Sequence, residues 1–271
     1  MLALLDEQRL PAPRGTKDRR GSVVIAGGPP ECPGGVVLAA NAALRAGAGR
    51  VVLAVHPAVA PHVAVAIPEA LVLGWDPEDD PGAELSGRAA DSGAALIGPG
   101  YASDISGAVP ALVERLDAAT VVLDAGALAA TPPLAESERA LVVAPNTSEA
   151  AELGGLDGDE TDLALALGDD LHRPLAVRGP TTVITDGRGG LWSHDADASG
   201  LGTPGSGDVL MGALSGVLAQ GLAPVHALAW AIAIHGRAGE VAERERPVGY
   251  LARDLVAALP AALAELGVAR A

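Results

Sequence analysis

A glycine-rich segment, Gly202-Thr203-Pro204-Gly205-Ser206-Gly207-Asp208, carries the residue types best suited to chemistry in this chain. Apolar residues recur with helical spacing directly after it, and Gly221 supplies a stop, so the spacing predicts a helix over residues 205–220. The N-terminus of such a helix presents unpaired backbone amides and the positive end of the helix dipole, which together bind anions. The segment therefore predicts a phosphate site.

Asp208 stands where the turn meets the predicted helix, and its carboxylate would repel a bound phosphate. A chemical role suits it better, because a carboxylate there could accept the proton of a hydroxyl that attacks a terminal phosphoryl group. The plainer alternative is that Asp208 only caps the helix and the glycines only form a turn. The residue pattern favours the chemical role over this structural one.

Length, charge and cysteine content exclude several classes of protein. The chain has 271 residues, of which 49% are hydrophobic, enough for one large α/β domain. Its formal charge of −16 argues against nucleic-acid binding, which needs a basic face. The single cysteine, Cys32, excludes an internal disulfide framework and a cysteine-based zinc site. With no signal-peptide pattern and no apolar run of the roughly 18 residues that span a bilayer, we expect a cytoplasmic protein without a membrane partner.

Short β-branched runs alternate along the chain with longer alanine-rich stretches. Buried parallel strands are expected over residues 22–26, 50–55, 94–97, 120–123 and 141–143. Helices are expected over residues 34–46, 104–116, 147–153, 224–244 and 250–266. Turn pairs separate three later runs and favour antiparallel edge strands over residues 175–178, 181–185 and 190–193. This order predicts a single-domain α/β fold over residues 1–271, a three-layer α/β/α sandwich with a mainly parallel sheet and antiparallel edge strands.

Several predicted strands end in glycine-rich or polar turns, and ligands of open α/β sheets bind at such carboxyl ends. The acidic segments 76–80 and 157–160 have Pro and Gly neighbours, so we expect solvated loops there rather than metal sites. Asp124, at the end of its strand, could bind a magnesium-linked water or cap the following turn, and capping is slightly preferred. Gly212 and Gly216, four residues apart on the predicted helix, are expected to permit close helix packing.

The blocks that carry a family resemblance lie in one order along the chain. They are residues 17–28, Gly34-Gly35 with the helix that ends in residues 43–49, residues 97–100, 121–128 and 178–184, and Gly205-Ser206-Gly207-Asp208-Val209-Leu210. Together these blocks resemble the NAD(P)H-hydrate dehydratases over about residues 17 to 240. The resemblance implies a ribokinase-like fold and the repair of hydrated nicotinamide cofactors, NADHX and NADPHX, with ADP or ATP as phosphoryl donor and Mg²⁺ bound to the nucleotide.

The resemblance also implies roles for particular residues. Asp208 would be the catalytic base. The nucleotide contacts would fall on Arg178, Gly179, Pro180, Thr181, Thr182 and Gly207, to which the anion-binding turn adds Gly205 and Ser206. The hydrated-cofactor contacts would fall on Gly35, Gly100, Asn146 and Asp208. No dedicated protein cage for a metal is expected, because Mg²⁺ commonly relies on phosphate oxygens and water.

Three positions depart from the pattern of the family. Asn146 replaces a histidine and cannot carry a proton at neutral pH, and it also suits a helix-entry residue. Arg178 replaces a lysine, which keeps the charge but changes the geometry of its donors. Pro204 replaces a glycine and removes one amide from the turn.

Two other classes of function stay open on these residues. A small-molecule kinase acting on a sugar or a hydroxymethylpyrimidine would use the same aspartate and turn, and a catalytically degenerate homologue would only bind nucleotide. The family often carries an N-terminal epimerase domain that does not fit before Lys17, so we expect cooperation with a separate epimerase. The resemblance further suggests a homotetramer and ADP as the donor.

Overall fold

The computed structural model describes residues 1–11, 16–78, 85–87, 92–196 and 198–267. One mixed sheet runs through it in the order β3-β2-β1-β4-β5-β6-β7-β8-β9. Its strands are β1 (Ser22–Gly27), β2 (Arg50–Val55), β3 (Leu71–Gly74), β4 (Ala94–Ile97), β5 (Thr120–Leu123), β6 (Ala140–Val143), β7 (Leu175–Val177), β8 (Thr181–Thr185) and β9 (Leu191–Asp195). Neighbouring strands from β3 to β7 are parallel, whereas β8 and β9 pair antiparallel at one edge. The expected sheet is confirmed.

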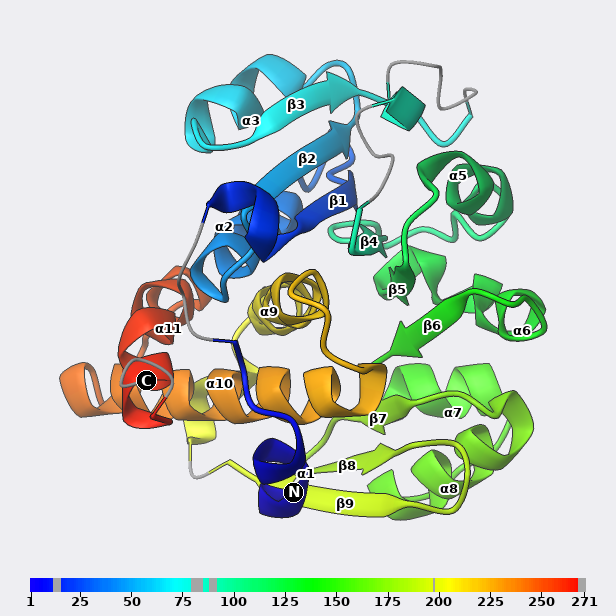
Figure 1. Ribbon diagram of the computed structural model, residues 1–271, viewed down its shortest axis with the longest axis vertical. Helices are drawn as coiled ribbons and strands as arrows, with labels where there is room; N and C mark the ends of the chain where they lie inside the picture. The colour runs from blue at the N-terminus through cyan, green and yellow to red at the C-terminus, as the bar shows by residue number, and fades with distance from the viewer. Residues whose placement is uncertain (12–15, 79–84, 88–91, 197, 268–271) are drawn as a thin grey trace.

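Helices cover both faces of this sheet (Figure 1). One layer holds α2 (Gly34–Arg45), α3 (Ala60–Ala66), α9 (Ser206–Leu218), α10 (Pro224–Glu245) and α11 (Ala252–Glu265), and the short α1 (Leu2–Glu7) lies beside α10. The other layer holds α5 (Val109–Leu116), α6 (Thr131–Ala135), α7 (Thr147–Gly154) and α8 (Glu160–Leu171). Each layer buries its own hydrophobic core against the sheet, so the three-layer sandwich is confirmed. Among the described helices, none is long and apolar enough to cross a membrane.

Some elements differ from the expectations. The 3₁₀ helices η1 (Lys17–Arg20), η2 (Ala125–Ala130) and η3 (Ser199–Gly202) were not expected, and neither were β3, α1, α3, α6 and α8. The helix expected from residue 104 begins only at Val109, because Asp104 first accepts the Ser106 amide in a local turn at 2.7 Å and Pro110 suits the first helical turn. The expected loop over residues 157–160 is wrong at its end, since Asp159 accepts the amides of residues 161 and 162 and caps α8.

Helix α9 packs directly on α2, as its small residues predict. A Cβ atom added to Gly212 would lie 2.1 Å from the carbonyl oxygen of Ala39, and one added to Gly216 would lie 2.4 Å from that of Ala43. Side chains at these positions would push the helices apart, which confirms the expectation for both glycines. The close packing holds the start of α9 against the start of α2, and so brings two glycine-rich turns together.

The same region is the topological switch point of the sheet. The chain passes from β1 through β2 to β3 on one side, and β4 then pairs with β1 on the other. The loops after β1 and β4 therefore meet, and the Gly28 amide donates to the Pro99 carbonyl at 2.9 Å. Open α/β sheets bind ligands in the crevice at such a point.

Candidate active site

The carboxyl group of Asp208 lies where these glycine loops converge. Gly205 adopts a positive φ of 87° as the N-cap of α9, and Asp208 is the third residue of the helix. A Cβ atom added to Gly35 would lie 2.8 Å from Asp208 Oδ1 and 2.8 Å from the Gly100 amide nitrogen. Only a glycine at position 35 therefore leaves room between the carboxylate and the loop after β4. Gly35, Gly100 and Asp208, assigned together from the sequence, are brought together by the fold.

The environment of Asp208 makes its carboxyl group a weaker acid. Burial and, to a smaller extent, the nearby carboxylate of Asp124 raise its pKa, Arg178 opposes them, and the net result is a rise from 3.8 to about 7. Asp124 itself is 6% exposed, and burial raises its pKa as well. Asp124 makes no N-cap side-chain hydrogen bond at the start of η2, so the expected capping role is wrong; the Ala125 amide donates to its carboxylate and lowers the pKa against the effect of burial. A base with a pKa near neutrality is well matched to proton transfer at physiological pH.

Arg178 brings positive charge to the anion-binding turn. A Cβ atom added to Gly207 would lie 2.8 Å from Arg178 Nη1, so the guanidinium rests directly against the turn. Arg178 Nε donates to the Ala144 carbonyl, and Nη2 lies 3.3 Å from Glu149 Oε2. These contacts fix a planar group with several donors beside the helix N-terminus, which is an arrangement suited to phosphate.

Asn146 and Glu149 form a capping box at the start of α7. The Glu149 amide donates to Asn146 Oδ1 at 3.0 Å, and the Asn146 amide donates to Glu149 Oε2 at 2.8 Å. The role of Asn146 as a helix-entry residue is therefore confirmed. Its contact with a hydrated cofactor stays a prediction.

A cavity of about 630 Å³ opens on the Arg178 side of the turn, and we call it the arginine cavity. Its apolar lining includes Leu201 of η3 and Ile232 of α10, and its polar lining includes Arg178 and Ser206. Of the residues assigned to the nucleotide, its walls include Arg178, Gly179, Pro180, Thr182 and Ser206. Asn146 also lines it, although the sequence assigned this residue to the other substrate. The outer residue Thr181 instead donates from its hydroxyl to Asp195 Oδ1 at 2.6 Å.

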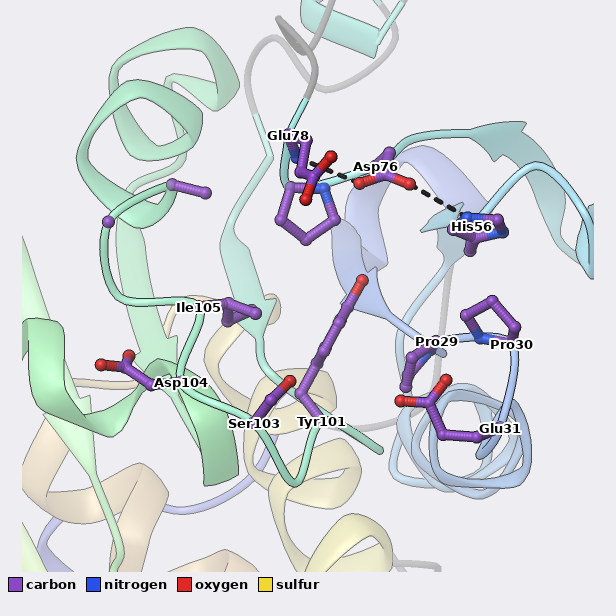
Figure 2. A pocket seen from close by; sticks show the side chains of 13 residues that line it. Pro29, Pro30, Glu31, His56, Asp76, Glu78, Tyr101, Ser103, Asp104 and Ile105 are labelled. Carbon is purple, nitrogen blue, oxygen red and sulfur yellow. Dashed lines mark hydrogen bonds and ion pairs between the residues drawn. The ribbon is translucent and has the colours of Figure 1, made fainter.

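A second cavity, of about 420 Å³, lies beyond the ends of β1 to β4, and we call it the acidic cavity. Four carboxylates line it, those of Glu31, Asp76, Glu78 and Asp104. Figure 2 shows Tyr101 standing between Pro29 and Ile105, with its hydroxyl toward the segment that carries Asp76 and Glu78. Burial raises the pKa of Tyr101 to about 12, and the negative charges of Asp76 and Glu31 add to the effect.

The acidic cavity is adjacent to the Asp208 site through Gly100. A Cβ atom added to Gly100 would lie 3.3 Å from Pro29 Cδ, and Pro29 lines the cavity. His56 also lines the acidic cavity, and its Nε2 atom lies 3.0 Å from Asp76 Oδ2 (Figure 2). Residues 76–78 form the expected loop, in which Asp76 is paired with His56 and only partly exposed; residues 79 and 80 lie outside the described residues.

Residues 23–261 match the family model described as NAD(P)H-hydrate dehydratase. The chain belongs to this family. It is 42% identical to the ADP-dependent (S)-NAD(P)H-hydrate dehydratase of Xanthomonas campestris, over 97% of this chain and 95% of that protein. The resemblance that the sequence motifs indicated is thus confirmed.

Solved structures and longer relatives agree with membership of the NAD(P)H-hydrate dehydratase family. The Bacillus subtilis ADP/ATP-dependent NAD(P)H-hydrate dehydratase, co-crystallised with ATP and Mg²⁺, superposes with a TM-score of 0.80 at 25% identity and covers 94% of both chains. A bifunctional NAD(P)H-hydrate repair enzyme of Moorella thermoacetica is 34% identical over 93% of this chain, which corresponds to 51% of the longer protein. A ribokinase-like protein of Enterococcus faecalis, at 22% identity and a TM-score of 0.83, supports the fold.

Sequence motifs of the NAD(P)H-hydrate dehydratase family did not point to every residue around Asp208. Glu149 pairs with Arg178, and a carboxylate three residues after Asn146 was a signal available in the sequence. His235 contacts Ser206 from α10, where nothing in the local pattern distinguishes it from a packed histidine. Tyr101 was likewise unmarked, although it directly follows the assigned Gly100.

Magnesium has no preformed cage among the described residues, where no group of three or more His, Cys, Asp or Glu side chains could hold a metal. Oxygen donors of the kind that Mg²⁺ prefers are nevertheless present, since the carboxylates of Asp124 and Glu149 both lie near Arg178. Two carboxylates are too few for a protein-only site. They fit an ion that arrives bound to nucleotide phosphates and completes its shell with water.

Proposed function

We propose that this protein is an ADP- or ATP-dependent (S)-NAD(P)H-hydrate dehydratase, a lyase that restores NADH or NADPH from the hydrates NADHX and NADPHX. One observation carries the proposal: a carboxylate with a pKa of about 7 stands between two glycine loops and directly beside an arginine-flanked helix N-terminus. Family membership and the names of the relatives support the same activity.

The chemistry follows from the weakness of hydroxide as a leaving group. Asp208 takes the proton of the ring hydroxyl, and that oxygen attacks the terminal phosphoryl group of the nucleotide, whose own bridging oxygen leaves with the bond electrons. The phosphorylated ring then expels phosphate and loses a proton, which restores the dihydropyridine. The summed reaction removes one water from the hydrate and hydrolyses one phosphoanhydride bond.

Each cavity receives one substrate in this proposal. The nucleotide occupies the arginine cavity, with its phosphates at Arg178 and Gly207 and with Gly179, Pro180, Thr182, Gly205 and Ser206 around it. Arg178 and the first-turn amides stabilise the charge on the transferring group. Mg²⁺, held by the phosphates with the carboxylates of Asp124 and Glu149 nearby, supplies further neutralisation when it is bound.

The hydrated ring lies between Gly35 and Gly100, where the absence of side chains gives it access to Asp208. The remainder of the dinucleotide then passes Pro29 and Tyr101 toward the acidic cavity, which is adjacent to Gly100. Asn146 stays a proposed contact, and so does Thr181.

The assay that tests the function follows the near-ultraviolet absorbance of the dihydronicotinamide after the protein is mixed with hydrated NADH, Mg²⁺ and either ADP or ATP. A rise that requires the nucleotide is the expected result and identifies the donor. A stable phosphorylated product would indicate a small-molecule kinase. Nucleotide binding without any product would indicate a non-catalytic homologue.

Other features of this function are also proposals. The two-function relatives support cooperation of this activity with an epimerase. The homotetramer, the cytoplasmic location and the organisation of residues 1–271 as one domain are proposed on the family resemblance and the sequence pattern.

A further inference from the structure

A buried histidine contacts the anion-binding turn and has no part in the reaction as proposed above. His235 lies on α10, on a face that is otherwise apolar, and is 8% exposed. Its Nε2 atom lies 2.9 Å from Ser206 Oγ and 3.1 Å from the Ser206 carbonyl oxygen. Burying an imidazole without hydrogen-bond partners is costly, and both of these contacts of Nε2 are with Ser206. The imidazole is therefore coupled to this one residue of the turn.

His235 is neutral in this environment. Burial and, to a smaller extent, the positive charge of Arg178 lower its pKa from 6.5 to about 4, against the opposing effect of the hydrogen bond to the Ser206 backbone. A neutral imidazole carries one hydrogen, on either Nδ1 or Nε2, and its partners decide which. The Ser206 carbonyl oxygen can only accept a hydrogen bond, so a bare Nε2 at 3.1 Å would face it lone pair to lone pair. The hydrogen therefore lies on Nε2.

This tautomer determines what the Ser206 hydroxyl does. The Nε2 hydrogen is shared between the carbonyl oxygen and Oγ, so Oγ accepts from His235. The hydroxyl hydrogen of Ser206 is then left to point away from the imidazole. Ser206 lines the arginine cavity together with Arg178, so the free hydrogen has a place to go.

The turn also needs an additional donor. Pro204 has no amide hydrogen, and the Ser206 amide is already used by the Thr203 carbonyl at 3.1 Å. Two backbone positions of the turn are thus unable to donate to a phosphate. The amides of Gly207 and Asp208 belong to the first turn of α9, where helix amides lack intrahelical partners. A side-chain donor at position 206 adds to this reduced set.

We propose that His235 is a positioning residue that fixes the Ser206 hydroxyl as a hydrogen-bond donor to the terminal phosphoryl group of the nucleotide. The inference rests on the proposed function for the identity of that group. In this arrangement the Ser206 hydroxyl donates directly to a phosphoryl oxygen. His235 does not touch the nucleotide; it donates from Nε2 to Ser206 Oγ and so keeps the hydroxyl hydrogen directed away from the imidazole. A structural alternative is that the pair merely ties α9 to α10.

The test compares four variants of the full chain in the absorbance assay. Ser206→Ala removes the donor and should lower kcat by roughly 10- to 100-fold, in the range known for single donors to a transition-state oxyanion or somewhat below it. His235→Met removes the orientation and should give a similar loss. The double variant should lose no more than the worse single variant, because both changes remove the same interaction.

Rescue distinguishes orientation from packing. His235→Gln places an amide N–H near the position of Nε2 and should recover most of the activity that His235→Met loses. Ser215→Ala is the matched control, because Ser215 is a fully buried serine of the same helix whose hydroxyl donates to the Met211 carbonyl at 2.8 Å. It should leave kcat unchanged. Additive losses, an equal loss in the control, or a glutamine variant as poor as the methionine one would overturn the inference.

Nucleotide binding separates this inference from the proposed function. Calorimetry should show that Ser206→Ala and His235→Met each weaken ADP binding several-fold and leave AMP binding unchanged, since AMP lacks the terminal group. If the wild-type protein has no dehydratase activity and this difference is found, the function fails and the inference stands. If ADP and AMP binding respond equally, the inference fails whether or not the enzyme is active.

Discussion

The arginine cavity and the acidic cavity both adjoin the Asp208 site and differ sharply in charge. The first is lined by Arg178 and by Ser206 at a helix N-terminus, whereas the second is lined by four carboxylates and one paired histidine. Both openings arise from the same edge of one sheet, so the fold alone does not set their charge. The difference teaches that the side chains around each cavity, rather than the fold, decide which substrate binds there. In the proposed arrangement Asp208 lies between the phosphoryl donor and the acceptor.

The largest effect is expected at Asp208. Asp208→Asn keeps the size of the side chain but cannot accept a proton, so turnover should fall about 10²- to 10⁴-fold, the usual contribution of a general base. ADP affinity should change little, because the phosphates lie on the other side of the turn. Absorbance kinetics and calorimetry on the same sample measure both quantities. An active asparagine variant would refute the assigned role of the carboxylate.

The second effect tests the charge of the arginine cavity. Arg178→Met should lower kcat/KM for ADP roughly 100-fold, and Arg178→Lys about tenfold, because lysine keeps the charge but loses the planar donors that reach Ala144 and Glu149. Arg173→Met is the control, since Arg173 also donates to a backbone carbonyl, that of Ala135, but does not line this cavity. A control as impaired as Arg178→Met would mean that the loss is one of folding.

The ionisation of Asp208 gives the third effect. Its pKa of about 7 means that the base is protonated below neutrality. We expect kcat/KM for the hydrate to fall about tenfold for each pH unit below 7 and to level off above it. A pH profile at saturating ADP measures this. A profile that stays flat down to pH 5 would show that burial does not hold the carboxyl group protonated.

The acidic cavity should influence which hydrate is preferred. Among the described residues, its walls carry no Arg or Lys to bind a 2′-phosphate, so its carboxylates should favour NADHX over NADPHX by several-fold. Asp76→Asn should narrow this ratio of kcat/KM values about twofold to threefold, and added salt should narrow it too, because salt screens the repulsion. Glu136→Gln removes an exposed charge that lies outside the cavity walls and should leave the ratio unchanged. Equal ratios for Asp76→Asn and wild type would place the 2′-phosphate elsewhere.

The two cavities also differ in how far the sequence predicts them. The arginine cavity contains a local signal, a glycine turn followed by an amphipathic helix, and its residues were assigned from that pattern and from the family resemblance. The acidic cavity depends on Glu31, Asp76 and Asp104 from three separate loops, and nothing local shows that they converge. β3 was missed although Leu71, Val72 and Leu73 form an apolar run, and its four residues match the length of β4 and β5, so the signal was available in the sequence. The contact between His235 and Ser206, 29 residues apart, could not be predicted because it depends on how α9 packs against α10.

The smallest expected effect concerns the stability of the fold. It tests whether the ionised carboxylate of Asp208 lowers the free energy of unfolding. The Asp208 carboxyl group ionises near its ordinary pKa of 3.8 in the unfolded chain but near 7 in the fold. Between these values the folded protein binds more protons than the unfolded chain, so the free energy of unfolding decreases as the pH rises from about 4 to about 7.

Asp208→Asn removes this dependence. Its melting temperature should match that of the wild type below pH 4, where both side chains are neutral, and should exceed it by a few degrees at pH 8, at about 2–4 °C for each kcal/mol of unfolding free energy. Calorimetric melting at both pH values measures the difference, and Asp170→Asn, an exposed change on α8, serves as control. A gain at pH 8 confined to position 208 would show that the same buried charge that makes the aspartate a useful base also weakens the fold. Equal melting temperatures at pH 8 would mean that water or Arg178 stabilises the carboxylate fully. The ionised Asp208 would then not destabilise the fold.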